Sequence, residues 1–164
     1  MARTKQGSTG TPATVALTRA HVPFTTHAYE HDSAAPSYGL EAAEVLGLPP
    51  EQVFKTLFVE VDGRLVVGIV PVSCRLDLKA VAAAAGGKKA TLADPALAER
   101  ASGYVVGGIS PLGQKRAHPT VLDDSALDHD KVYVSGGRRG LDIGLSPDDL
   151  VRLTRATLAP IARD

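Results

Sequence analysis

The most regular segment of the chain reads Val53-Phe54-Lys55-Thr56-Leu57-Phe58-Val59-Glu60-Val61, then Asp62-Gly63, then Arg64-Leu65-Val66-Val67-Gly68-Ile69-Val70-Pro71-Val72. β-Branched and aromatic residues dominate both flanks, which is typical of strands, and Asp-Gly is a two-residue hairpin signal. Both predicted strands are almost continuously apolar, so we expect them to lie centrally in a sheet that is covered on both faces. Lys55 interrupts the first strand.

Other elements follow from capping and turn residues on either side of this hairpin. We predict helices after Thr11-Pro12 and ended by Pro23, from Ser37 to Leu46 and ended by Gly47, over Leu78 to Ala85 after Asp77, from Asp94-Pro95 to about Ala101, and after Ser146-Pro147. Further strands are predicted at Phe24 to Tyr29, Tyr104 to Val106, Thr120 to Asp123, Lys131 to Val134, Leu141 to Leu145 and Ala156 to Ile161.

The order of these elements lacks the regular strand–helix rhythm of a doubly wound sheet. We therefore expect an α/β fold, a single domain over residues 11–164 with a curved, barrel-like mixed β-sheet and surrounding helices. Residues 1–10 contain no apolar run, so we expect a disordered N-terminal tail rather than a signal peptide.

The composition describes an ordinary globular chain with no overall charge. Of 164 residues, 44% are hydrophobic and 22% charged, and 18 basic residues balance 18 acidic ones. Without a basic field, any contact with nucleic acid must be local or assisted by a partner. A single cysteine, Cys74, excludes an internal disulfide, and no apolar run is long enough to span a membrane. We expect a cytoplasmic protein without a membrane segment.

Lys55 has two interpretations from its place in an apolar strand. It lies at a sheet edge with its ammonium in water, or it faces a functional cavity and binds a carbonyl, ribose or phosphate oxygen. On spacing alone the edge is the better interpretation, since lysine usually stays solvated.

Two glycine-rich loops leave similar alternatives open. Gly107-Gly108-Ile109-Ser110-Pro111 could approach a ligand closely and offer backbone N–H groups to an oxyanion, or it could be an ordinary turn. Ser135-Gly136-Gly137-Arg138-Arg139-Gly140 could bring arginines to phosphates, or it could be a solvated basic turn. Neither loop has the P-loop or dinucleotide pattern.

No pattern for a metal or a protein nucleophile is found in the sequence. The five histidines lack ligand spacing, so no metal is expected, and Cys74 without a positioned histidine is better explained as a core thiol. A Gly-x-Ser-x-Gly elbow is also absent.

Taken together, several segments resemble the YbaK family of Cys-tRNA(Pro) deacylases, relatives of the editing domain inserted in prolyl-tRNA synthetase. The resemblance runs from Thr11 to the C-terminal helix and is carried by Phe24-x-x-His27-x-Tyr29-x-His31-Asp32, Gly39-x-Glu41-Ala42-Ala43, Phe54-Lys55-Thr56-Leu57, Gly103-Tyr104-x-Val106-Gly107-Gly108-Ile109-Ser110-Pro111-Leu112-Gly113-Gln114-Lys115 and Val132-Tyr133-Val134-Ser135-Gly136-Gly137-x-Arg139-Gly140-Leu141. These segments occur in the family's order within one domain.

The resemblance implies a YbaK-like fold and a set of catalytic and substrate-binding residues. Lys55 matches the family's essential lysine, with Thr56 beside it, and Gly107 and Gly108 begin the loop that holds the aminoacyl carbonyl and terminal adenosine. The remaining implied binding residues are Tyr29, Tyr38, Ile109, Ser110, Pro111, Ser135, Gly136, Gly137 and Asp142. Position 38 is often another aromatic in the family, and position 142 varies.

The implied activity is trans-editing of mischarged Cys-tRNA(Pro), and of Cys-tRNA(Cys), without a cofactor. In the family the cysteine thiol of the substrate attacks its own ester carbonyl, so the enzyme positions groups and stabilises the oxyanion. The implied partners are the acceptor end of an aminoacyl-tRNA and prolyl-tRNA synthetase. The alternatives are a deacylase for another small amino acid, such as alanine on tRNA(Pro), and a non-catalytic module that binds a nucleotide or aminoacyl group.

Overall fold

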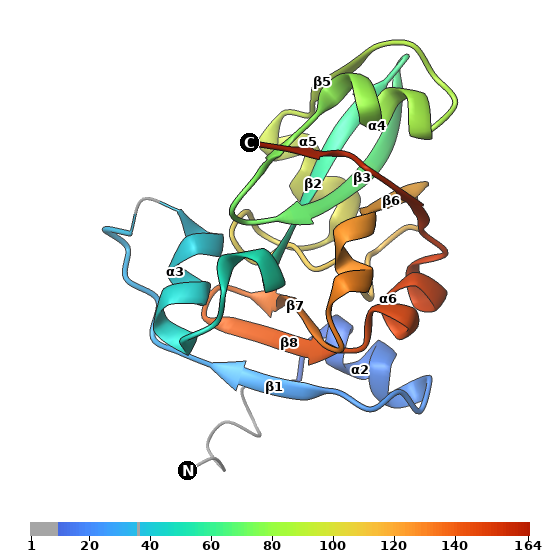
Figure 1. Cartoon of the computed structure of the whole chain (residues 1–164). Helices are drawn as coiled ribbons and strands as arrows, with labels where there is room; N and C mark the ends of the chain where they lie inside the picture. Colours follow the sequence, from blue (N-terminus) through green and yellow to red (C-terminus); the bar gives the residue numbers. More distant parts are fainter. Residues whose placement is uncertain (1–9, 36) are drawn as a thin grey trace.

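A computed structural model describes residues 10–35 and 37–164 (Figure 1). The tail predicted for residues 1–10 lies outside the described residues except for Gly10, which is exposed. The predicted hairpin is present as β2 (Phe54–Val61) and β3 (Arg64–Pro71), which pair antiparallel along their whole length. Asp62 and Gly63 both have positive φ, 50° and 86°, as a tight turn between twisted strands requires.

The hairpin lies inside a mixed sheet, as the sequence predicts. This five-stranded sheet has the order β5-β2-β3-β6-β9, in which β6 (Thr120–Asp123) runs parallel to both β3 and β9 (Thr157–Ala159), and β5 (Ala90–Leu92) runs antiparallel to β2. A second, antiparallel sheet has the order β1-β8-β7, built from β1 (Thr25–Ala28), β8 (Leu141–Leu145) and β7 (Val132–Arg138). A third consists of β4 (Arg75–Leu76) and β10 (Ala162–Arg163).

The predicted barrel-like closure is not found among the described residues, because the strands divide into these three sheets. The two larger sheets touch at one isolated parallel bridge, between Val53 and Tyr133. In Figure 1 the five-stranded sheet forms the upper half of the molecule and the three-stranded sheet the lower half.

Each predicted helix start is confirmed by a side-chain cap. Thr11, Ser37, Asp77, Asp94 and Ser146 each accept a hydrogen bond from a first-turn backbone N–H. They begin α2 (Pro12–Arg19), α3 (Tyr38–Leu46), α4 (Leu78–Ala84), α5 (Pro95–Ser102) and α6 (Pro147–Thr154). Two short 3-10 turns, η1 (Pro50–Gln52) and η2 (Asp124–Asp128), complete the list of described helical elements.

The strand predicted at Tyr104 to Val106 is wrong. These residues form a turn after α5, in which the Tyr104 side chain is buried and its hydroxyl donates to the Leu112 carbonyl at 2.6 Å. Tyr104 anchors a loop here, while Val105 is exposed to solvent.

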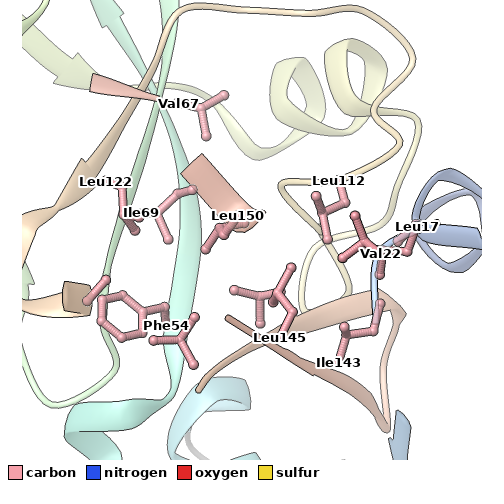
Figure 2. Packing of buried hydrophobic residues seen from close by; sticks show 14 of the residues in the cluster. Leu17, Val22, Phe54, Val67, Ile69, Leu112, Leu122, Ile143, Leu145 and Leu150 are labelled. Atoms are coloured by element: carbon pink, nitrogen blue, oxygen red, sulfur yellow. The ribbon is translucent and has the colours of Figure 1, made fainter. Parts of the chain in front are cut away.

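Two apolar cores cover both faces of the hairpin. Figure 2 shows the larger one, in which Phe54, Ile69 and Leu122 of the five-stranded sheet pack toward Ile143 and Leu145 of the three-stranded sheet. On the other face, Val59 and Val70 belong to a second cluster with Val81 of α4. The central placement predicted for β2 and β3 is thereby confirmed.

Candidate active site

A cavity of about 410 Å³ opens beside the N-terminal half of β2. Its walls come from β2, the first turn of α3, the start of α5, the loop after α5, and the facing ends of β7 and β8. Eight of the predicted site residues line it: Tyr29, Tyr38, Lys55, Thr56, Gly107, Ile109, Ser135 and Asp142. Segments far apart in the sequence therefore meet here, as the resemblance implies.

The other predicted residues lie behind this wall. Gly108 donates its N–H to the Val105 carbonyl at 2.8 Å, and a Cβ there would lie 2.7 Å from the Arg138 Cα. Its amide is therefore engaged in a turn and is not free to act as the oxyanion donor that the sequence suggests. Close packing, with no side chain that could fit, is what requires glycine at this position.

Ser110, Pro111, Gly136 and Gly137 also support the site from behind. Ser110 is fully buried and accepts a hydrogen bond from the Leu112 N–H, and Pro111 beside it is buried. The Gly136 carbonyl accepts from the Thr11 hydroxyl at 2.6 Å. Gly137 donates its N–H to the Ser135 Oγ at 3.2 Å, which orients this cavity side chain. None of these four residues is among those that line the cavity, and the contacts of Ser110, Gly136 and Gly137 hold the segments next to it.

Lys55 reaches the cavity from inside the sheet. Its side chain is half-buried, and burial lowers the pKa of its ammonium below the ordinary 10.5, while the nearby Cys74 acts in the opposite direction. The side chain also lines the wall of the cavity. The structure therefore favours the cavity interpretation over the edge interpretation.

Thr56, next to Lys55, is 9% exposed, and its buried Oγ1 has no hydrogen-bond partner among the described residues. Buried hydroxyls nearly always find a partner, so an orphan beside a cavity is a group that a ligand can satisfy.

A buried acid lies across the cavity. Asp142 of β8 is 6% exposed, and burial raises the pKa of its carboxyl to about 7. No hydrogen bond to its carboxylate is found in the described part of the chain. Burial, and then the charges of Asp142 and Glu41, raise the pKa of Tyr29 to about 12, so its phenol is neutral at physiological pH.

Tyr38 forms one wall and is held from several directions. Its ring lies against Gly107, where a Cβ would come within 2.6 Å of it. His31 stacks near it at 5.3 Å, and the Arg139 guanidinium lies 5.2 Å from its centroid. His31 in turn contacts the Glu41 carboxylate at 2.8 Å.

The loop that carries Gly107 is fixed by two residues whose anchoring role the sequence does not reveal. The Val106 N–H donates to the Glu99 carboxylate at 2.8 Å, and the Arg139 Nε donates to the Val106 carbonyl at 2.9 Å. For Arg139 the sequence left contact with phosphate and a solvated basic turn open, and Glu99 gave no signal because its partner is a backbone atom.

Neither a metal cluster nor a membrane helix is found within the described ranges. No group of three His, Cys, Asp or Glu residues there gathers closely enough to hold a metal ion. No helix of residues 10–35 or 37–164 combines the length and the hydropathy needed to cross a bilayer.

Comparison with known proteins agrees with this arrangement. A profile of the family described as the aminoacyl-tRNA editing domain matches residues 34–153. EbsC of Enterococcus faecalis, a candidate Cys-tRNA(Pro)/Cys-tRNA(Cys) deacylase, is 39% identical over 121 residues, 73% of each protein.

Solved structures show the same fold. The crystal structure of the hypothetical protein APE2540 superposes with a TM-score of 0.83 at 26% identity, covering 93% of this chain and 99% of that one. A candidate trans-editing enzyme for prolyl-tRNA synthetase gives a TM-score of 0.79 at 24% identity, with 93% and 96% covered. The chain thus belongs to the aminoacyl-tRNA editing domain family.

Proposed function

We propose that this protein is a free-standing deacylase that hydrolyses mischarged aminoacyl-tRNA, with Cys-tRNA(Pro) as its preferred substrate and Cys-tRNA(Cys) as a second one. Its family makes it an aminoacyl-tRNA editing enzyme of the hydrolase type. The observation that carries the proposal is the convergence of Lys55, Thr56, Gly107 and Asp142 on one cavity, in a relative of a candidate Cys-tRNA(Pro) deacylase.

The polar walls of the cavity suggest how the two ends of the substrate bind. Asp142, a buried carboxylate without a partner in the described chain, provides a counter-charge for the α-ammonium of the aminoacyl group. Lys55 binds a ribose or phosphate oxygen of the terminal adenosine. Of the two glycines implied as oxyanion donors, Gly107 is the one we retain, since the Gly108 N–H is already bonded to the Val105 carbonyl.

No protein nucleophile is needed for the reaction. The substrate thiol attacks its own ester carbonyl, the C–O bond to the ribose breaks, and the thiol proton passes to the departing ribose hydroxyl. The cyclic thioester that forms is then hydrolysed by water. Positioning and oxyanion stabilisation supply the acceleration.

The partners and location follow from this substrate. The acceptor end of tRNA is the ligand, and prolyl-tRNA synthetase is the proposed source of specificity, because a chain with balanced charges has little general affinity for RNA. The activity belongs where tRNA is charged, in the cytoplasm, and residues 11–164 form the editing domain.

Lys55→Ala, assayed on Cys-, Ala- and Pro-charged tRNA(Pro), tests the proposal. We expect rapid loss of label from Cys-tRNA(Pro) with the parent protein and a fall of at least about 100-fold with the variant, at unchanged thermal stability. Lys79→Ala, which changes an exposed lysine of α4 outside the cavity, should act like the parent.

The role of Lys55, the deacylase function and the substrate preference can each be contradicted by a different result. Near-normal turnover by Lys55→Ala contradicts the role of Lys55. Inactivity of the parent toward all three charged tRNAs, with and without prolyl-tRNA synthetase, contradicts the function itself, and preference for Ala-tRNA(Pro) contradicts the specificity.

A further inference from the structure

The N-terminal half of β2 has one bare edge. On one side β2 pairs with β3 from Phe54 to Val61. On the other side β5 pairs only with the C-terminal residues Val59 to Val61. The preceding residues of β2 border the cavity instead of another strand.

The direction of each backbone group along β2 can be assigned from hydrogen bonds at its two ends. The Val53 carbonyl accepts from the Val72 N–H at 2.8 Å, so odd-numbered residues direct their N–H and C=O groups toward β3. The Phe58 carbonyl accepts from the Ala93 N–H at 3.0 Å, on the opposite edge. Because this direction alternates along a strand, the N–H and C=O of Thr56 leave the same edge as Phe58, away from β3.

No β-ladder of the described chain includes Thr56 on that edge, since the ladder with β5 begins at Val59 and the bridge to Tyr133 lies at Val53. The other sheet forms the Val53–Tyr133 bridge, and no ladder continues from it; Ser135 of β7 pairs with Asp142 of β8 and lines the cavity. The N–H and C=O of Thr56 are therefore directed toward the space between β2 and β7, as one donor and one acceptor. Such a pair is rarely left without partners.

An aminoacyl ester carries one acceptor and one donor that match the N–H and C=O of Thr56. Its α-ammonium nitrogen, Cα and carbonyl repeat the N–Cα–C=O unit of one residue of a polypeptide. In an antiparallel hydrogen-bonded pair, two residues exchange both N–H···O bonds, so a single residue is enough to satisfy one partner.

We propose that the main chain of Thr56 binds the aminoacyl group as one residue of an added strand. The Thr56 N–H donates to the ester carbonyl, and the Thr56 carbonyl accepts from the α-ammonium. This inference rests on the proposed deacylase function and adds the element that aligns the reacting carbonyl. As negative charge develops on the carbonyl oxygen, the Thr56 N–H becomes an oxyanion donor alongside Gly107.

A backbone role is tested by replacing one amide with an ester. The α-hydroxy analogue of threonine at position 56 removes the N–H and keeps the side chain. The matched control carries the α-hydroxy analogue of valine at Val59, whose N–H points toward β3 and which does not line the cavity. Both variants are assayed on Cys-tRNA(Pro) and on 3-mercaptopropionyl-tRNA(Pro), which lacks the α-amino group.

We expect the ester at position 56 to lower kcat for Cys-tRNA(Pro) by about 100-fold, the loss typical of one oxyanion donor. The ester at Val59 should lower the melting temperature while retaining kcat at a temperature where it is folded. With the unmodified protein, the substrate that lacks the amino group should show a KM raised about tenfold, because the Thr56 carbonyl loses its donor.

Two results overturn the inference while the proposed function stands. One is equal kcat for the unmodified protein and the position 56 ester, and the other is an equal loss for both esters at matched folded fractions. Inactivity of the unmodified protein toward Cys-tRNA(Pro) would instead overturn the proposed function, and this inference with it.

Discussion

Asp142 carries a stability cost that depends on pH. Its ordinary pKa of 3.8 applies when the chain is unfolded, and burial raises the pKa to about 7 in the folded protein. The carboxylate is therefore penalised only when folded, so the cost is absent below about pH 4, grows between the two values and is complete above about pH 7. The difference corresponds to a cost of up to about 4 kcal/mol.

We predict that Asp142→Asn raises the melting temperature at pH 8 and leaves it unchanged at pH 4, measured by calorimetry across this range. Asp124→Asn, which changes an exposed neighbour of the buried Asp123, should change stability at neither pH. Equal stability of the parent and Asp142→Asn at pH 8 would show that the carboxylate is better solvated than its burial indicates.

Position 107 requires glycine for two reasons, its positive φ and the close approach of the Tyr38 ring. Its φ is 90°, and a Cβ would lie 2.6 Å from the Tyr38 ring. We predict that Gly107→Ala costs about 1–2 kcal/mol of stability and lowers kcat/KM for Cys-tRNA(Pro) at least tenfold, because the loop and the Tyr38 wall must both move.

Gly47→Ala separates these effects, since Gly47 has a φ of 69° in open space at the end of α3. It should cost about 1 kcal/mol in denaturant unfolding and leave kcat/KM intact. If both variants lose activity to the same degree, the packing of Gly107 on Tyr38 has no special part in the site.

The residues that converge on the cavity were foreseeable only in part. Lys55 was predicted because it is a charged residue within an apolar strand, and Gly107 because it belongs to a pair of adjacent glycines. The need for glycine at position 108 could not be traced in the sequence, because the atoms that a Cβ would meet belong to the backbone of Arg138, thirty residues later. The sequence shows that glycines occur together in this loop, but only the packing shows that Gly107, and not Gly108, lines the cavity.

At the scale of elements, α5 and the turn after β7 hold the loop that carries Gly107. Glu99 accepts the Val106 N–H and Arg139 donates to the Val106 carbonyl, so one peptide is held from both sides. We predict that Glu99→Ala lowers kcat/KM about tenfold, the cost of one charge-assisted hydrogen bond.

Glu99→Gln should recover most of this activity, because its amide oxygen can accept the same N–H. Asp149→Ala removes the exposed ion pair with Arg152 and serves as the surface control, with no expected change in steady-state kinetics. The absence of recovery in Glu99→Gln would point to the charge of Glu99, and a loss in Asp149→Ala would point to general destabilisation.

Elements with local signals were predicted and elements without them were missed. The caps and the Asp62-Gly63 turn are properties of a few neighbouring residues, which is why the five helices and the hairpin were placed. β4, β5 and β10 have two or three residues each, too few for a periodic pattern, and each pairs with a strand distant in the sequence. Tyr104 to Val106 was mistaken for a strand because buried loop anchors share strand composition.

At the scale of the whole molecule, zero net charge sets the strength of contact with tRNA. With 18 basic and 18 acidic residues, we expect only two or three phosphates to be neutralised at the acceptor end. A log–log plot of kcat/KM against salt concentration should therefore have a slope of about −2 to −3. A slope steeper than about −5 would reveal a larger basic footprint than this charge balance provides.

The fold class was predicted correctly at this scale, whereas the barrel-like closure that was also predicted is not found among the described residues. Interleaved elements around a central hairpin indicated a mixed α/β domain, which the structure confirms. Whether strands close into a barrel depends on contacts between distant strands, and in the described part of the chain one isolated backbone bridge, Val53 to Tyr133, is the sole strand pairing between the two larger sheets. The division of the strands into separate sheets could therefore not be predicted from local sequence patterns.

The bare edge of β2 also affects how the protein behaves in a crowded solution. Unpaired edges recruit strands from other chains and seed aggregation. Here the free stretch ends at the Ala93 contact on one side and at the Tyr133 bridge on the other. A foreign strand would have to align over several residues to gain stability, and the gap is too short for that alignment. This short gap can thus admit a small ligand while giving a strand of another chain too few residues to pair with.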